Sequence, residues 1–358
     1  MQQRIHGKKS LMKTQLLKRV RRKKEDTAPS RITNDTVAEH RERILAGGRR
    51  FKYPIQYARH RLVFNTVIVT IVFLALLVVV GWWQLYPMQN SSAFMYRLTR
   101  VIPVPVAVVN GEQVPYSDYL VQYRASEYYL DKYGEIKLNT SDGQRQLAYI
   151  KRQSLDKAEQ TAYARQIARP RNIRVSNQEV DDFISVERNT INGRVSQETY
   201  DSSMQLYYGE TSSDYRLRVA NSMLEAKVAF AIDTDATAQV KQAQTLISST
   251  QGDLAAVASQ MANSKGGKVT VGQSGMVDAT SKFSGLRVAD VAKLNKGATS
   301  GPLKSTTDDG YYFAKVIDKS GNQVDFLYLH IPLTKFADDF AKLGHAGKIH
   351  EYITISDK

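Results

Sequence analysis

An uncharged run of 22 residues, 62–83, constrains this chain more than any other feature of its sequence. As a helix it would be about 33 Å long, enough to cross the ~30 Å hydrocarbon core of a membrane. Trp82, Trp83 and Tyr86 stand at its end, where the aromatic belt of a membrane protein belongs. Apolar runs in buried core helices are usually nearer 10–14 residues, roughly half this length. We therefore predict a single membrane span, residues 62–86.

The charges on either side of this run indicate its orientation. Residues 1–61 hold 18 Lys and Arg against 5 Asp and Glu, a net charge of +13, whereas the other 297 residues hold 32 against 30. An excess of Lys and Arg marks the cytoplasmic side of a span. A cleaved signal peptide is the alternative, but the basic region and the apolar run are both too long for one. We therefore predict a cytoplasmic tail (1–61), an uncleaved signal anchor in the cell membrane, and extracytoplasmic domains.

The basic tail has its densest charge at residues 8–24, with nine Lys and Arg in seventeen positions. Such a segment can contact anionic lipid heads or RNA, or it can simply fix the topology as a solvated chain. We favour the solvated chain. No aromatic residues are interleaved with the charges, so nucleic acid is not an expected partner.

Several classes of chemistry are excluded by residues that the sequence lacks. The chain has no Cys, which excludes disulfides, thiolate metal sites and cysteine nucleophiles. No His occurs from residue 61 to 329, and His330, His345 and His350 show no metal-ligand spacing. His330 falls in an alternating strand pattern and is interpreted as a structural residue. We therefore predict no metal site and no cofactor.

Residues 104–230 predict a hairpin followed by helices. Asn110-Gly111 between short apolar segments is a strong two-residue hairpin signal. Ser117 or Asp118 is expected to cap the next helix, and Ser176 with Glu179 to form a capping box. The other expected elements are a loop at 134–143, a long helix at 144–169 ended by Pro170, a helix after Ser196 with Tyr200, Met204 and Tyr207 inward, and a helix at 212–229.

From residue 228 the pattern changes to α+β. A strand is expected at 228–232, then helices at 236–249 and from Asp253, a small helix at 288–292 and a strand at 311–317. The last residues, 320–358, predict a strand (324–331), a helix (336–343) and a terminal strand (352–355). This extension either joins the sheet of the preceding domain or packs back on the first.

The extracytoplasmic part resembles the SurA/PrsA class of foldases. The segments VAVVNGEQVPYSDY, ARQIARPRNIRVSNQEVDDFI and YYGETSSDYRLRVANSMLEAKV, in this order, resemble the N-terminal chaperone domain of that class. Residues 231–319 are similar to a parvulin-type prolyl isomerase, through GDLAAVASQMANSKGG and LNKGATSGPLKSTTDDGYYFAKVID. The resemblance implies a single-span membrane protein with a mostly α-helical SurA-like domain (104–230), an α+β parvulin-like domain (231–319) and a C-terminal extension (320–358).

The parvulin-like domain departs from the resemblance at its catalytic positions. Phe230 and Tyr312 stand where active parvulins carry histidine, so no catalytic residue is assigned. Prolyl isomerisation needs no covalent step, only a site that binds the twisted amide better than the planar forms. Apolar walls for such a site would come from Met276, Phe283, Tyr312 and Phe313, or these residues are ordinary core. We expect weak or no isomerase activity.

The leading hypothesis is a membrane-anchored foldase that binds unfolded, newly exported polypeptides. Twelve Tyr between residues 116 and 215 are candidate contacts for such chains. The alternative is an envelope assembly or interaction protein that uses the degenerate domain as a docking surface, since a fold does not fix a function. A working isomerase is the third hypothesis.

Overall fold

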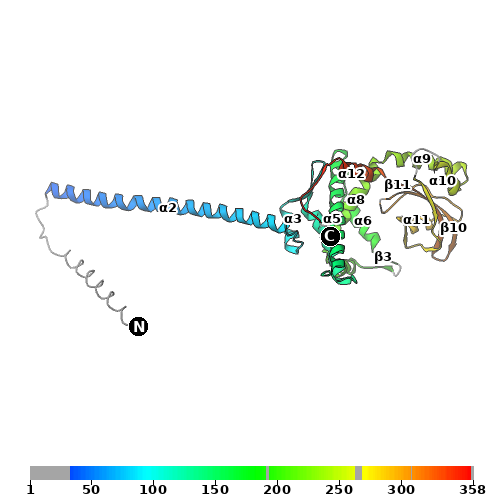
Figure 1. Ribbon diagram of the computed structural model, residues 1–358, viewed down its shortest axis with the longest axis horizontal. Helices are drawn as coiled ribbons and strands as arrows, with labels where there is room; N and C mark the ends of the chain where they lie inside the picture. Colours follow the sequence, from blue (N-terminus) through cyan, green and yellow to red (C-terminus); the bar gives the residue numbers. More distant parts are fainter. Residues whose placement is uncertain (1–32, 191–192, 263–267, 308, 356–358) are drawn as a thin grey trace, which may run out of the picture. The chain divides into compact units, whose positions relative to one another are not determined.

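The computed structural model describes residues 33–190, 193–262, 268–307 and 309–355, without the side chains of residues 47–59 (Figure 1). The chain divides into two compact units, Met1–Gly81 and Trp82–Lys358. Helix α2 (Asn34–Leu85) begins well before the predicted span. Its part His60–Leu85 contains an 18-residue stretch with a mean hydropathy of 2.9, and length and composition allow it to cross a membrane. The dense charge of residues 8–24 lies outside the described residues.

A helical domain follows, built on a hairpin. Helix α3 (Ala93–Val101) leads into strands β1 (Pro105–Val109) and β2 (Glu112–Pro115). Asn110 and Gly111 connect them with φ values of 48° and 87°, both positive as the hairpin turn requires, so this prediction is confirmed. The remaining elements are α4 (Tyr116–Tyr133), α5 (Ser141–Ala168), the 3-10 turn η1 (Arg169–Arg171), α6 (Asn177–Glu187), β3 (Asn189–Thr190), β4 (Gly193–Arg194), α7 (Gln197–Tyr208) and α8 (Ser212–Ile232).

The helix termini test the capping predictions. The capping box of Ser176 and Glu179 is confirmed at the start of α6, and Ser196 caps α7. The cap predicted at Ser117 or Asp118 is wrong, because α4 begins directly after Pro115 without a side-chain cap. Asp118 is buried and forms an ion pair with Arg165 of α5 instead. Its carboxylate therefore joins two helices rather than ending one.

Tyrosines dominate the core of the helical domain. Tyr116, Tyr119 and Tyr123 follow one face of α4 and are almost fully buried against β1 and α5. The rings of Tyr119 and Tyr123 stack at 5.7 Å between centroids. The Tyr116 hydroxyl donates to the Leu85 carbonyl at 2.6 Å, so its polar end is satisfied inside the core.

The strand predicted at 228–232 is wrong, because α8 continues as a helix to Ile232. The segment Leu224–Ala231 contains Leu, Ala, Glu and Lys, which favour helix, beside Val228 and Phe230. Asp233 then ends α8 and caps the following helix α9. Phe230, which falls in that predicted strand, therefore lies on a helix.

The α+β region forms around one antiparallel sheet. Strand order is β5-β11-β10-β9, and β6 also pairs with β11. Figure 1 shows α9 and α10 on one side of this sheet and α11 on the other. Each side has its own core, around Phe313 and around Tyr312. The elements are α9 (Thr234–Ser249), α10 (Leu254–Ala262), β5 (Thr270–Gln273), β6 (Val277–Asp278), β7 (Lys282–Phe283), β8 (Leu286–Arg287), α11 (Val288–Ala292), β9 (Leu303–Lys304), β10 (Gly310–Ser320) and β11 (Gln323–Pro332).

The C-terminal extension is shared between the two parts. Strand β11 lies in the α+β sheet, whereas α12 (Lys335–His345) and β12 (Ile349–Glu351) pack on the helical domain. Phe336 and Phe340 of α12 contact the Tyr163 ring at 5.2 and 5.8 Å between centroids. Strand β12 pairs with β1, and it precedes the strand predicted at 352–355, which is wrong. The α+β region is therefore an insertion between α8 and α12.

Candidate functional site

A cluster of tyrosines lies on the surface of the helical domain where α4 meets α7. Tyr129 and Tyr133 come from α4, and Tyr207 and Tyr208 come from α7. Ring centroids are 5.7 Å apart for Tyr129 and Tyr208, and 5.3 Å apart for Tyr133 and Tyr207. We call these four residues the tyrosine cluster. All but Tyr208 are exposed, so the prediction that Tyr207 points inward is wrong.

Two exposed aliphatic residues stand close to this cluster in the sequence. Leu206 and Ile136 are both exposed beside it in sequence, and the Tyr133 hydroxyl donates to the Leu206 carbonyl at 3.0 Å. Tyrosine offers a rigid apolar ring with one polar end, so ordering it on binding costs little side-chain entropy. An exposed group of such rings is suited to weak contact with many apolar segments.

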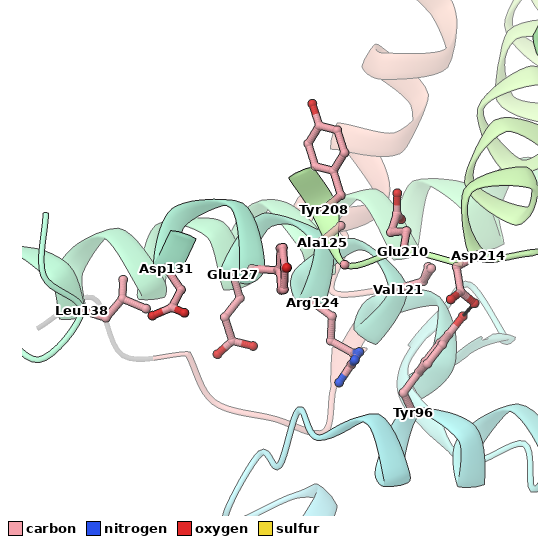
Figure 2. A pocket seen from close by; sticks show the side chains of 12 residues that line it. Tyr96, Val121, Arg124, Ala125, Glu127, Asp131, Leu138, Tyr208, Glu210 and Asp214 are labelled. Atoms are coloured by element: carbon pink, nitrogen blue, oxygen red, sulfur yellow. Dashed lines mark hydrogen bonds between the residues drawn. The ribbon is translucent and has the colours of Figure 1, made fainter. Parts of the chain in front are cut away.

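A cavity of about 370 Å³ adjoins the tyrosine cluster, and Tyr208 belongs to both. Figure 2 shows Arg124, Glu127 and Asp131 in a row along α4, with Tyr96 and Asp214 meeting at one end. Four carboxylates and one guanidinium line it, beside aromatic rings. The lining residues are Tyr96, Val121, Arg124, Ala125, Glu127, Tyr128, Asp131, Leu138, Tyr208, Gly209, Glu210 and Asp214.

The turn between α7 and α8 depends on Gly209. Its φ is 64°, a left-handed conformation that side chains rarely adopt. A Cβ at this position would lie 2.8 Å from Cδ2 of the Tyr128 ring. Glycine is therefore needed for the close approach of this turn to α4, which shapes the cavity wall.

Two of the cavity carboxylates are held by fixed partners. Asp214 accepts a hydrogen bond from the Tyr96 hydroxyl at 2.6 Å and pairs with Arg100 at 3.2 Å. Glu210 accepts from Nη2 of Arg218 at 2.8 Å. Burial raises the pKa of Glu210, and burial, together with the Asp214 carboxylate, raises the pKa of Tyr96. These hydrogen bonds and ion pairs hold this wall of the cavity in place.

The other two carboxylates lie nearer to solvent. Glu127 accepts hydrogen bonds from the hydroxyls of Ser91 at 3.0 Å and Tyr123 at 2.9 Å. Asp131 is exposed, 3.6 Å from the Lys132 ammonium. Carboxylate oxygens are acceptors only, so this side of the cavity can receive backbone N–H groups or Lys and Arg side chains.

The four residues predicted to wall a proline pocket do not lie together. Phe283 and Tyr312 share one core of the α+β region, whereas Phe313 is buried in the core on the opposite side of the sheet. Neighbouring residues of a strand point to opposite faces, which separates Tyr312 from Phe313. Met276 is exposed in the turn before β6.

His330, interpreted from the sequence as a structural strand residue, lies on β11, and its pairing with Tyr312 was not predicted. Its ring stacks on Tyr312 with centroids 4.4 Å apart, and the two are direct partners in the register of β10 and β11. The Tyr312 hydroxyl donates to Oδ2 of Asp309 at 2.6 Å, and Nε2 of His330 lies 3.1 Å from the Asp309 carbonyl oxygen. The signal was present, because a hairpin with its turn near Gly321 places residue 330 opposite residue 312.

Phe230, the other degenerate position, contacts the same region from outside. Its ring lies 5.0 Å from that of Tyr311, and the Lys304 ammonium lies 5.1 Å from its centroid. Tyr311 and Tyr312 face opposite sides of the sheet, so Phe230 does not lie beside the stacked rings of His330 and Tyr312. Among the described residues, no group of three His, Asp or Glu could hold a metal ion.

The comparison with protein families gives a match that begins within α2 and ends within α8. Residues 57–229 match the family model described as the SurA-like N-terminal domain. The match ends before the α+β region, and no curated protein matches the chain. A SurA-like N-terminal domain supports a protein of the SurA/PrsA type and suggests a chaperone or foldase function.

Proposed function

We propose that the chain is a membrane-anchored chaperone that binds unfolded, newly exported polypeptides through the tyrosine cluster and the adjoining cavity. The observation that carries the proposal is the exposed aromatic surface on a domain with the SurA-like match. Each ring buries apolar surface of a client segment, and the carboxylates beside it accept hydrogen bonds from the client. A client segment held in this way is unavailable for aggregation.

The anchor in this proposal is His60–Leu85, with the N-terminus in the cytoplasm. It rests on the length and hydropathy of this helix and on the Lys and Arg excess that precedes it. The folded domains would then lie outside the membrane, where exported chains emerge. The basic tail would fix this topology, with anionic lipid heads as its nearest partners and no role in binding nucleic acid.

Substitutions in the tyrosine cluster test the chaperone proposal. We expect Tyr129→Ser with Tyr207→Ser, in the full chain in detergent, to lose most of its suppression of light scattering by a diluted, denatured client. Tyr149→Ser is the control, because Tyr149 is an even more exposed tyrosine outside the cluster. Circular dichroism must show that both variants fold. Undiminished protection by the cluster variant would refute the assignment.

A second experiment separates the chaperone from an assembly or interaction protein. A chaperone protects several unrelated clients weakly, whereas an interaction protein holds one partner in fixed stoichiometry. Cross-linking in intact cells distinguishes a broad set of adducts from a single one. A single stoichiometric adduct through the α+β region would favour the docking alternative.

A second candidate function is prolyl-peptide isomerisation by the α+β region, favoured by the stacking of His330 on Tyr312. The resemblance to parvulins implies a histidine pair, and here the strand after the last family segment supplies a histidine next to Tyr312. Tyr312 is buried and its hydroxyl is bound to Asp309, so we expect low activity. The measurement is cis/trans exchange of an X-Pro tetrapeptide with the full chain and with His330→Ala. Strong catalysis that His330→Ala abolishes would contradict this expectation.

A further inference from the structure

The most exposed large apolar side chains among the described residues after the span lie in one short segment. Three large apolar side chains have a higher exposed fraction than any other in the described residues after the span. Met88 is 61%, Phe94 68% and Val101 81% exposed. Ile102, next to Val101, is also exposed. An apolar patch of this kind marks a surface that contacts another apolar phase or molecule.

Helix α3 organises this segment into two faces. Ser92 caps it by accepting from the Met95 N–H, and Met95, Tyr96 and Thr99 are buried in the helical domain. Phe94, Arg97 and Val101 are exposed, at spacings of three and four residues, and therefore share the opposite face. Tyr96 is bonded to Asp214 at 2.6 Å, which fixes the rotation of α3 and keeps the Phe94 face outward.

The charge of the segment matches a phospholipid surface. Residues 87–111 contain Arg97 and Arg100 and no Asp or Glu. Arg97 lies on the exposed face, between Phe94 and Val101. A helix with apolar side chains and Arg on the same outer face is suited to the boundary between headgroups and acyl chains.

Sequence distance restricts what can cover this face. Helix α3 begins at Ala93, eight residues after α2 ends at Leu85. Eight residues reach at most about 28 Å even when fully extended. If α2 crosses the membrane, the face of α3 is kept within reach of the bilayer surface at all times, whereas a client or a second copy must compete for it.

We propose that the exposed face of α3, with Met88 and Ile102, binds the outer surface of the membrane that α2 crosses. This inference rests on the proposed anchor but not on client binding. Its consequence is that the helical domain is held on the bilayer by two connected elements. Contact through α3 restricts the rotation of the domain about the end of the span.

Site-directed fluorescence tests this placement, because the chain has no native Cys. Phe94→Cys and Val101→Cys would each carry an environment-sensitive label in the full chain, reconstituted in vesicles of zwitterionic and anionic phospholipid. Val72→Cys, in the span, and Ser202→Cys, exposed on α7, are the lipid and water controls. All four positions are exposed, so none of the substitutions removes a core side chain.

The expected result is that labels at 94 and 101 lose most of their fluorescence to a quencher on the lipid and are protected from aqueous iodide. The label at 202 should show the reverse. Labels at 94 and 101 that behave like 202, while 72 is quenched by lipid, would overturn the inference and leave the anchor intact. A label at residue 72 that iodide quenches would overturn both the proposed anchor and the membrane contact of α3. Photocross-linking from residue 101 to a client or a second copy, with no lipid adduct, would also refute it.

Discussion

The carboxylate of Asp233 accepts a hydrogen bond from the backbone N–H of Thr334 at 2.9 Å, across 101 positions of the sequence. The same oxygen, Oδ2, lies 3.1 Å from the N–H of Lys335, and Oδ1 accepts from the N–H of Ala236 at 2.9 Å. One buried side chain therefore holds both connections between the helical domain and the inserted α+β region.

Removing this carboxylate should loosen both connections. We expect Asp233→Ala to lower the free energy of unfolding by about 2–4 kcal/mol, because it removes a helix cap and leaves the N–H groups of Ala236, Thr334 and Lys335 without this acceptor. Denaturant unfolding gives the energy, and limited proteolysis shows whether cleavage moves to residues near 233 and 334. Asp235→Ala is the control, since Asp235 is exposed two residues further along the chain. Equal stability of both variants would show that the Asp233 carboxylate does not hold the two connections together.

The closeness of the two connections predicts that the insertion is removable. Deleting 234–332 and joining the ends with a short Gly-Ser linker should leave a folded helical domain with α12 and β12 in place. We expect this deletion to keep much of the protection of denatured clients, since the tyrosine cluster is retained. Circular dichroism and light scattering are the measurements. A folded deletion that protects nothing would move client binding to the α+β region.

Gly209 offers a test of the cavity wall. We expect Gly209→Ala to destabilise the helical domain by about 1–3 kcal/mol, because a Cβ meets the Tyr128 ring and the positive φ disfavours alanine. Thermal unfolding measures the loss. Gly301→Ala is the control, as a Cβ there would meet no atom within 4 Å and the φ is not positive. An unchanged Gly209→Ala variant would mean that the turn can move without cost.

Glu159 predicts a pH dependence of stability. It is 2% exposed, and burial, followed by repulsion from Glu351, raises its pKa from 4.5 to about 8 although Arg152 lies 3.7 Å away. The folded state therefore holds a proton that the unfolded state has lost, so this group reduces stability as pH rises from about 4.5 to about 8. The slope is at most about 1.4 kcal/mol per pH unit.

The variant Glu159→Gln isolates this effect. It should flatten the pH profile of the unfolding free energy and gain stability over the original chain at alkaline pH. Asp156→Asn is the control, because Asp156 contacts the same Arg152 but is far more exposed. A profile that is unchanged by Glu159→Gln would show that the carboxyl is ionised in the folded chain.

Local signals in the sequence were sufficient for much of the helical domain. The Asn110-Gly111 turn, the Ser176 capping box and the helix end near Pro170 each depend on a few neighbouring residues, and the structure has all three. The strand predicted around Phe230 failed because Val and Phe favour strands only where a sheet is available to pair with. The helix α8 packs along α5 instead.

The candidate sites were not predicted because they depend on distant contacts. The tyrosine cluster needs α4 and α7 to lie side by side, and nothing in either helix alone specifies that. His330 and Tyr312 are 18 positions apart and meet only through the hairpin register. The pairing of β12 with β1 joins Glu351 to Ala107, and no periodicity in the sequence indicates it.

That last pairing sets an order of events for a chain made from its N-terminus. Val109 faces Ile349 in the register, so β1 has no partner on this edge until a further 240 residues have been synthesised. At about 5–20 residues per second, the wait is on the order of tens of seconds. During this interval the newly made chain is only partly folded, and the edge of β1 that β12 later covers is open.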